Sequence, residues 1–455
     1  MPFSPIILCA VDQCAAALAF SPSLTSNHQT HEGCHSHVTT KSPLFPVYID
    51  HFNNSEGIPD AFYLLSHFHT DHMKGLSHVW SAGTIICDEV TRALVTQKYG
   101  VALAQRIRSQ SLFQASTLFR MSVVASPTPA TMQEMEEVGR SSVSGGSNSS
   151  DKARDDVRLY LLPAFHIPGS VMFFLETPIG NILYTGDFKY DETARRLLDP
   201  FFAEHRVDHV YIDDTWLHLG HSQALSSTHS NPRMPVASKM LPESELAETI
   251  EAVDRRMDQR VRDFSLNGPS SDAASGPYVL RVYLHNQFGK EHTIQRLATR
   301  LGVTAFVDAE RYERLRFLAS FNSVIAQANK AFCIELSGFA PLPADAMLPR
   351  VEVVSSLKCI APEELQAAAA RNGGTPHYGI VISGWARMQR RKDGGDTSVW
   401  GIPTTLHCTP QQIIDFIALL RPMSVTTLHY KPCRGRVWWR SGLGRTCGGR
   451  TALSC

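Results

Sequence analysis

The feature that most constrains this chain is a run of metal-binding side chains at residues 67–72, with the sequence His-Phe-His-Thr-Asp-His. Three imidazoles and one carboxylate fall within six positions, directly after an apolar run that is typical of a strand. Zinc and similar ions favour imidazole nitrogen, and a carboxylate can complete a site that keeps a position open for water. The alternating His67 and His69 can face one ion. Asp71 and His72, where the chain is expected to enter a helix, can face a second ion.

Two further candidate ligands follow in the order that a two-metal hydrolase needs. His166 lies in the run Ala-Phe-His-Ile-Pro-Gly-Ser, and Asp187 lies in Tyr-Thr-Gly-Asp-Phe. Each comes where an apolar strand meets a turn, so each is expected to project from the rim of a sheet. Asp187 suits a bridging role, because one oxygen to each ion holds two metals about 3.5–4 Å apart. Taken alone, His166 reads as a core or turn histidine and Asp187 as a turn residue. The ordered set favours a metal centre over a chance cluster among the 20 histidines.

Length and composition set the broad class of the protein. A chain of 455 residues with 43% hydrophobic content is expected to form two closely joined domains with additional excursions. The 43 basic and 43 acidic residues cancel, so a nucleic-acid enzyme of this composition must concentrate its cations locally. Ten cysteines without a Cys-x-x-Cys pair indicate free thiols and a reducing compartment. No run of 18 apolar residues occurs, and we expect no membrane association.

The remaining patterns indicate an α/β protein. Strands are expected at residues 278–284, 303–307, 379–383 and 425–429, and helices at 292–301, 310–319 and 410–420. Alternation of strands and helices in the middle of the chain predicts a mostly parallel sheet. Tracts rich in Ser, Gly and Pro at 126–156, 222–238 and 265–277 are predicted to be disordered surface insertions.

These motifs resemble those of the β-CASP DNA-repair nucleases of the metallo-β-lactamase superfamily, the Artemis, Apollo and Pso2 type. Tyr-Thr-Gly-Asp-Phe-Lys-Tyr at 184–190 and Pro-Gly-Ser-Val-Met-Phe at 168–173 carry the resemblance, which runs from about residue 46 to residue 431. Asp50 matches the family's first motif, a strand-end aspartate that supports the histidine loop. The resemblance implies an α/β fold in which a metallo-β-lactamase αββα sandwich carries an inserted α/β β-CASP domain.

The resemblance also implies the domain boundaries. Residues 1–44 are predicted to be a disordered leader, and 45–221 the first part of the metallo-β-lactamase domain, including the insertion 126–156. Residues 222–397 are predicted to form the β-CASP domain, with insertions at about 222–238 and 265–277, and 398–432 to return to the first domain. Residues 433–455 form an irregular tail in which Arg and Trp alternate; this tail either contacts nucleic acid or is an unstructured extension.

Two more residues join the predicted metal centre through the resemblance. Asp213 matches the motif that opens the β-CASP region, where DNA-processing members carry Asp and RNA-processing members carry Glu, so it favours DNA. His407 matches a late histidine of the family that lies by the second metal. Leu406, Cys408 and Thr409 around it depart from the usual pattern of a preceding acidic residue and two following serines. A structural surface histidine is the alternative interpretation.

The predicted site is therefore built from two ligand sets and one shared carboxylate. His67, His69 and His166 form the first set, and Asp187 is shared between the two ions. Asp71, His72 and His407 form the second set. The predicted catalytic residues are Asp71, Asp187, Asp213 and His407, and the predicted cofactor is zinc, with one or two ions bound.

Two residues of the β-CASP region are predicted to contact substrate. Lys290 opens a helix in Gly-Lys-Glu, where free backbone N–H groups and a full positive charge can receive a phosphate; a solvated lysine at a helix start is the alternative. Trp385, in Ser-Gly-Trp, can stack on a base, and a buried aromatic is the alternative.

The resemblance implies a nuclear, zinc-dependent DNA nuclease. We expect a 5′-to-3′ exonuclease of DNA repair, acting on interstrand crosslinks or telomere ends by attack of a metal hydroxide on the phosphodiester. Its partners are expected to be single- or double-stranded DNA with 5′ ends, together with repair or telomere proteins. The alternatives are an RNA-processing β-CASP endonuclease, a small-molecule metallohydrolase of the glyoxalase type, and a metal-free scaffold protein.

Overall fold

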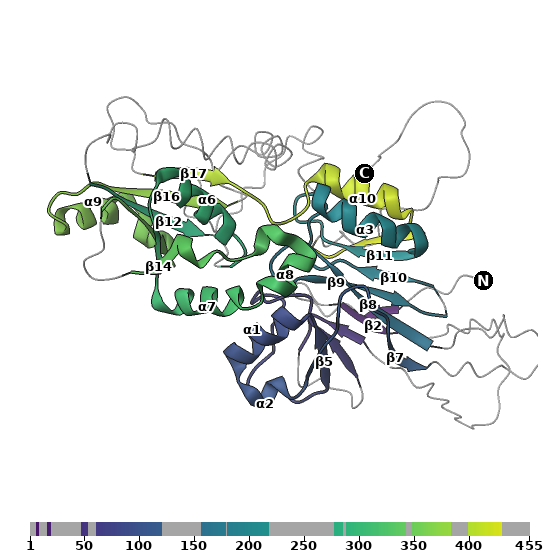
Figure 1. Cartoon of the computed structure of the whole chain (residues 1–455). Coiled ribbons are helices and arrows are strands. Elements are labelled where there is room, and N and C mark those ends of the chain that lie inside the picture. Colours follow the sequence, from purple (N-terminus) through teal and green to yellow (C-terminus); the bar gives the residue numbers. More distant parts are fainter. Residues whose placement is uncertain are drawn as a thin grey trace, which may run out of the picture.

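The computed structural model describes two units that lie side by side (Figure 1). The described residues are 6–8, 16–19, 47–52, 61–120, 156–178, 180–217, 277–284, 288–342, 348–383 and 399–429. One unit contains two six-stranded sheets, and the other contains a third sheet of six strands.

The first sheet has the strand order β1-β2-β3-β4-β5-β6. Strands β3 to β6 are parallel, whereas β1, β2 and β3 pair antiparallel. The strands are β1 (Ile6–Leu8), β2 (Ala16–Ala19), β3 (Val47–Ile49), β4 (Phe62–Leu64), β5 (Thr84–Cys87) and β6 (Ile107–Ser109). The helices α1 (Glu89–Tyr99) and α2 (Val101–Ala104) follow β5 and cover one face of the sheet.

Strands β1 and β2 lie within residues 1–44, so the structure differs from the predicted disordered leader. Both strands are short apolar runs, Ile-Ile-Leu and Ala-Ala-Leu-Ala. Strand β2 pairs with β3, with Ala16 opposite Ile49, and so satisfies backbone groups at the edge of the first sheet. The other residues of the 1–44 range lie outside the described residues.

The second sheet has the order β18-β11-β10-β9-β8-β7. Strands β18, β11 and β10 pair in parallel with one another, and β10, β9, β8 and β7 pair antiparallel. The strands are β7 (Ser116–Arg120), β8 (Asp156–Pro163), β9 (Val171–Glu176), β10 (Ile182–Tyr184), β11 (His209–Ile212) and β18 (Ser424–Thr427). The helices α3 (Glu192–Glu204) and α10 (Pro410–Leu420) lie over its outer face (Figure 1).

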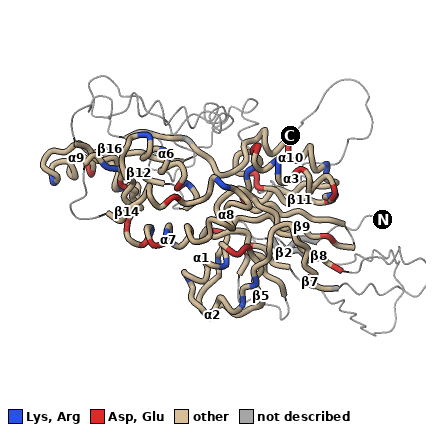
Figure 2. Tube along the Cα trace, in the orientation of Figure 1, with Lys and Arg blue, Asp and Glu red and all other residues tan. Residues whose placement is uncertain are grey.

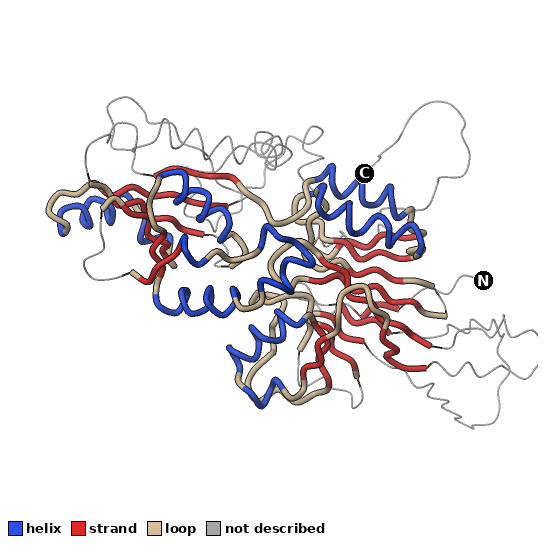
Figure 3. Tube along the Cα trace, viewed as in Figure 1, coloured by secondary structure: helices blue, strands red, loops and turns tan. Residues whose placement is uncertain are grey.

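The two sheets of this unit stack on one another between layers of helices (Figure 3). Alternate residues of β9 show the arrangement, because side chains of a strand point to opposite faces. Val171, Phe173 and Leu175 pack in the core between the two sheets. Met172 and Phe174 pack against α3 and α10 on the other face. The order of layers is therefore helix, sheet, sheet, helix.

The third sheet has the order β14-β13-β15-β12-β16-β17, and every pair in it is parallel, which confirms the predicted parallel sheet. Its strands are β12 (Val279–Leu284), β13 (Ala305–Val307), β14 (Phe339–Pro341), β15 (Arg350–Val354), β16 (His377–Ser383) and β17 (Val399–Pro403). Its α-helices are α6 (Glu291–Leu301), α7 (Ala309–Ala319), α8 (Asn322–Asn329) and α9 (Pro362–Arg371). The short 3-10 helices are η5 (Lys330–Phe332), η6 (Leu336–Gly338) and η7 (Leu357–Ile360). We call this part the inserted unit, because residues 277–403 lie in sequence between β11 and α10 of the first unit.

The inserted unit shares a hydrophobic core with the first unit. Val90 and Leu94 of α1, together with Ile167, belong to the same buried cluster as the strands of the third sheet. Leu406, just before α10, joins that cluster as well. The metal-binding loops predicted from the sequence therefore lie next to a packed junction between the units.

Helix α10 begins and ends where the sequence predicted, at residues 410 and 420. Thr409 caps it in a reciprocal arrangement with Gln412, and Pro410 occupies the first turn, where its missing N–H costs nothing. The cap fixes the direction of the preceding residues, including His407. Acidic and basic positions are interspersed along α3 and α7 (Figure 2), in keeping with the balanced composition. Among the described helices, none has the length and hydropathy that crossing a bilayer requires.

Several predictions fall on residues that the structure does not describe. These are nearly all of the three predicted insertions, Trp385, and the tail 433–455. Asp156 and Pro277, at the ends of two of the predicted insertions, are described, and Asp156 begins β8.

Candidate metal centre

The histidine run leaves β4 at the edge of the first sheet. Residues 70–75 form turns, so the predicted entry into a helix is wrong. Gly75, the last residue of these turns, has a φ of 86°, which does not allow a helix to continue through it. The turns still bring His67, His69 and His72 to one place, and all three are buried.

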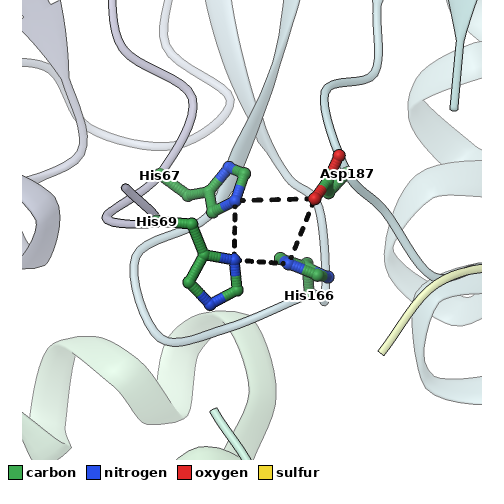
Figure 4. Close-up of side chains that lie close together, drawn as sticks. All are labelled: His67, His69, His166 and Asp187. Carbon is green, nitrogen blue, oxygen red and sulfur yellow. Dashed lines mark hydrogen bonds and ion pairs between the residues drawn. The ribbon is translucent and has the colours of Figure 1, made fainter. Parts of the chain in front are cut away.

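Four of the predicted ligands form a closed ring of contacts (Figure 4). Nδ1 of His69 lies 3.1 Å from Nε2 of His67 and 3.1 Å from Nε2 of His166. Oδ2 of Asp187 lies 3.7 Å from the same atom of His67 and 3.4 Å from that of His166. We call these four residues the first cluster. Asp187, just past β10, and His166, between β8 and β9, project from the rim of the second sheet, as predicted.

The outer nitrogen of each histidine in the first cluster faces an oxygen. Nδ1 of His166 lies 3.0 Å from the Leu406 carbonyl, and Nε2 of His69 lies 3.4 Å from the Phe288 carbonyl. Nδ1 of His67 lies 2.8 Å from the Ser66 hydroxyl. A carbonyl only accepts, so the protons of His166 and His69 are assigned to these outer nitrogens. Such contacts orient metal-ligating histidines and fix their tautomers.

Asp50 organises the histidine loop, as its match to the first family motif implies. Its carboxylate accepts from the Ser66 backbone N–H at 2.8 Å and from the Ser66 hydroxyl at 2.7 Å. It also lies 2.9 Å from Nδ1 of His72. Because the Ser66 hydroxyl donates to Asp50, its oxygen is left to accept the Nδ1 proton of His67. One buried carboxylate therefore sets the tautomers of both His67 and His72.

The donor atoms of this region fit divalent cations. With protons on the outer nitrogens, the inner nitrogens of the first cluster present only lone pairs to one another. Nε2 of His72 and Oδ1 of Asp187 lie 3.4 Å apart, are buried, and have no hydrogen-bond partner within the described part of the chain. Buried polar atoms need a partner. Imidazole nitrogens and carboxylate oxygens are the donor set of zinc sites, so a cation would satisfy these atoms.

A second cluster lies on the other side of Asp187. It consists of Asp187, Asp213, His407 and His429. Nδ1 of His407 lies 2.7 Å from Oδ2 of Asp213, and its Nε2 lies 4.0 Å from Oδ2 of Asp187. Nε2 of His429 lies 3.3 Å from Oδ1 of Asp213 and 3.7 Å from Oδ1 of Asp187. Asp213 follows β11 directly, and Thr215 donates to it at 2.6 Å.

The structure leaves two predicted ligands, His72 and Asp71, outside both clusters, and Asp71 is the exposed one. Its side chain is 59% exposed, and its Oδ2 lies 3.9 Å from Nε2 of His72. The carboxylate therefore stands at the solvent-facing rim of the site. His72, by contrast, is buried and aims Nε2 at Asp187.

The two clusters differ in the protonation that their surroundings favour. Burial lowers the pKa of His67 and of His166 well below the usual value, and lowers that of His69 to about 4. These three rings are therefore neutral at pH 7, which is the form that binds metals. Burial also acts to lower the pKa of His407, but the Asp213 and Asp187 carboxylates outweigh it and raise that pKa. For Asp187, burial acts to raise the pKa, but the neighbouring histidines outweigh it and hold the pKa low.

Lys290 is buried, so the interpretation as a solvated lysine is wrong. Its side chain is 4% exposed, and burial lowers its pKa to about 8. It precedes α6, and it lies two positions after Phe288, whose carbonyl faces His69. The backbone of Lys290 thus stands next to the first cluster. Trp385 lies outside the described residues.

Sequence reasoning missed three groups of the site. His429 follows β18, and it reaches the second cluster because β18 pairs in parallel with β11, which ends at Asp213. A histidine at the end of the predicted strand 425–429 was the available signal, but the pairing partner of that strand was not visible in the sequence. The carbonyls of Phe288 and Leu406 are backbone groups, so no side-chain pattern marks them.

The chain is similar in sequence to several curated proteins, at low identity. No protein-family model matches the chain. The chain is 26% identical over 279 residues to the 5′ exonuclease Apollo of Gallus gallus, covering 61% of this chain and 45% of that protein. It is 24% identical over 388 residues to the DNA cross-link repair protein SNM1 of Arabidopsis thaliana, covering 84% of this chain and 63% of that protein. A solved structure of a protein of unknown function from Enterococcus faecalis V583 has a TM-score of 0.41 at 13% identity, covering 81% of this chain and 75% of that chain.

The curated relatives at this level of similarity are named as 5′ exonuclease Apollo or as DNA cross-link repair proteins. The human DNA cross-link repair 1A protein is 24% identical over 366 residues, covering 80% of this chain and 27% of that protein. The chain spans about half the length of the Apollo proteins that it matches. The chain is therefore similar in sequence to proteins named as a 5′ exonuclease and as DNA cross-link repair proteins.

Proposed function

We propose that this chain is a metal-dependent nuclease that degrades DNA from its 5′ ends. The observation that carries the proposal is the first cluster, in which three neutral, buried imidazoles turn their lone pairs toward one another beside Asp187. Similarity to proteins named as a 5′ exonuclease and as cross-link repair proteins supports the substrate and the polarity.

We further propose that the helix-sheet-sheet-helix unit is a metallo-β-lactamase sandwich and that the inserted unit is a β-CASP domain. The boundaries are those expected from the sequence, 45–221 and 398–432 for the first domain and 222–397 for the second. Residues 398–432 contain α10 and β18, which pack on and pair within the second sheet, and this supports the proposed return of the chain. The cofactor is zinc, with one or two ions.

The residues of the metal centre have different proposed roles. His67, His69 and His166 would hold one ion, and Asp187 would reach both. Asp71, His72 and His407 would hold the second ion. His429 lies beside them, with its Nε2 3.7 Å from Oδ1 of Asp187. When bound, the ions supply a water molecule of lowered pKa for attack on the phosphodiester and stabilise developing charge on oxygen. Asp213 orients the rings of His407 and His429 by accepting from both.

The inserted unit would supply the contact to the DNA end. Lys290 precedes α6, where its positive charge and the N-terminus of the helix would favour an anion. A terminal phosphate carries close to two negative charges at pH 7 and is attracted to such a position. Trp385 remains a proposed stacking residue. The Asp at 213, rather than Glu, favours DNA over RNA as substrate.

We place the protein in the nucleus, where it would act in repair of interstrand crosslinks or in processing of telomere ends. Its partners would be DNA with 5′ ends and proteins of the repair or telomere machinery. Similarity to cross-link repair proteins supports the repair assignment.

A nuclease assay with end-labelled substrates tests the proposal. Purified protein is measured for zinc and incubated with single- and double-stranded DNA and RNA, each carrying a 5′-phosphate or a 5′-hydroxyl. We expect stepwise loss of nucleotides from DNA 5′ ends, little action on RNA, and complete inhibition by a chelator. Internal cleavage of RNA would instead identify the RNA-processing alternative.

The variant Asp187→Asn tests the metal centre at the carboxylate that both clusters share. It removes the charge shared by both clusters while it preserves the shape of the side chain and the fold. We expect a folded protein, by circular dichroism, without nuclease activity. Full turnover by this variant would exclude the two-metal centre.

A further inference from the structure

The inserted unit reaches the first cluster through one turn, residues 288–291. The Phe288 carbonyl faces Nε2 of His69 at 3.4 Å, and the Phe288 ring contacts the Phe68 ring edge-on, with 6.5 Å between ring centroids. His69 is the only member of the first cluster that turns Nδ1 inward; His67 and His166 turn Nε2. The inward nitrogen of His69 follows from the proton that it directs at Phe288.

The turn is pressed against the loop that carries His166. Gly289 has a φ of 100°, which a residue with a Cβ rarely adopts. A Cβ at this position would lie 2.4 Å from Cγ2 of Ile167 and 3.0 Å from Cδ1 of Leu406. Ile167 adjoins His166, and Leu406 supplies the carbonyl that faces that histidine. The turn therefore touches the supports of two ligands at once.

A buried ion pair of the inserted unit holds the shape of this turn. Oε2 of Glu291 accepts from the Gly289 N–H at 2.7 Å, and Oε1 lies 3.3 Å from a guanidinium nitrogen of Arg311. The Glu291 and Arg311 side chains are 5% and 7% exposed. Burying two charges costs free energy that a pair of this kind barely recovers, so stability alone gives a weak reason for it. Holding a backbone carbonyl against a metal ligand gives a specific one.

We propose that Glu291 and Arg311 are positioning residues of the metal centre, which hold the Phe288 carbonyl against His69 and so fix the tautomer of that ligand. This inference rests on the proposed metal-dependent function. The inserted unit then has a role in building the metal centre, in addition to contacting substrate.

The test compares Glu291→Gln with Glu352→Gln. Glu352 is also a buried carboxylate of the inserted unit, and it accepts from Arg350 at 2.7 Å, on β15 of the third sheet. Zinc affinity is measured by competition with a chelator, and the cobalt-substituted protein is examined by visible absorption, which reports the geometry of the ligands. The melting temperature of the metal-free protein reports the purely structural cost of each change.

We expect Glu291→Gln to weaken metal affinity about tenfold, the lower end of effects seen when contacts behind a ligand are lost, and to shift the cobalt bands. Glu352→Gln should lower the melting temperature with unchanged affinity and spectrum. Gly289→Ala, which pushes the turn away from Ile167, should reproduce the spectral shift.

Two outcomes would overturn the inference. One is an unchanged affinity and spectrum in both Glu291→Gln and Gly289→Ala; the other is an equal loss of affinity in Glu291→Gln and Glu352→Gln. Failure of the wild-type protein to bind zinc or cobalt would be a different result, because it would refute the proposed function itself.

Discussion

The first and second clusters share Asp187, but they differ in the arrangement of their protons and charges. In the first, every histidine gives its outer proton to an oxygen, and the inner atoms face one another without protons between them. In the second, His407 and His429 turn toward Asp213, and the charges of the cluster compensate one another. The first is also fully buried, whereas the His429 side chain is 29% exposed.

The difference indicates how each cluster would behave without metal. In the first cluster the lone pairs of the ligand atoms face one another, and no proton or cation of the cluster lies between them. The hydrogen bonds around the cluster hold its side chains in place. We therefore expect it to bind a cation tightly. The second already satisfies itself through ion pairs, so a cation there must compete with them. We therefore expect the first ion to be held more strongly than the second.

The largest predicted effect is that of a change within the first cluster. His166→Ala should remove the tightly held ion and with it several kcal/mol of transition-state stabilisation, a rate loss of about a thousandfold or more. Zinc content by elemental analysis and nuclease rate are measured together. His205→Ala, at a histidine that stacks on Phe201 away from the site, serves as the control for folding. A variant at 166 that keeps its zinc would remove the distinction between the clusters.

A smaller effect is expected in the second cluster. His429→Ala and His407→Ala should each retain the first ion and lose activity by about a hundredfold, in the lower range for groups that assist proton transfer or orientation. Titration with zinc followed by calorimetry should show one tight site and a weakened second one. Complete loss of zinc from either variant would mean that the two clusters bind as one unit.

The support behind the ligands can be tested at Asp50. Asp50→Asn keeps the side-chain shape but weakens the hydrogen bonds to Ser66 and His72, so metal affinity should fall by about 10- to 100-fold. Chelator competition measures this change. If affinity is unaffected, preorganisation by hydrogen bonds is not what separates the first cluster from the second.

The smallest predicted effect concerns substrate and leaves both clusters intact. Lys290→Ala should reduce the preference for 5′-phosphorylated DNA over 5′-hydroxyl DNA by about tenfold, which corresponds to the loss of one hydrogen bond to a charged group. Zinc content should not change. Equal rates of degradation of 5′-phosphorylated and 5′-hydroxyl DNA by the wild-type protein would contradict a terminal phosphate site and favour endonuclease action.

Elements with local signals were predictable from the sequence. Asp50 and Asp213 each follow an apolar strand, and the match of each to a family motif located both. Helix α10 was placed at its observed residues, and in the structure Thr409, Pro410 and Gln412 mark its start within four positions. The residue types of the histidine run, three imidazoles and one carboxylate, were enough to predict a metal site.

Features that depend on long-range pairing were not predictable. His429 enters the second cluster only through the pairing of β18 with β11, whose residues are more than 200 positions apart in sequence. The exposed place of Asp71 follows from turns where a helix was expected. Strands β1 and β2 were missed because short apolar runs gain order only from the partner strand that they join.

Because the chain is synthesised from its N-terminus, the contacts of Leu406 and His429 can form only late in synthesis. A ribosome adds about 5–20 residues each second, so roughly ten to fifty seconds separate the synthesis of Asp187 from that of His429. During that interval the emerging chain carries every residue of the first cluster, but it lacks the last member of the second cluster and, for most of the interval, the carbonyl behind His166. If the proposed function holds, full nuclease activity would appear only after β18 has paired with β11.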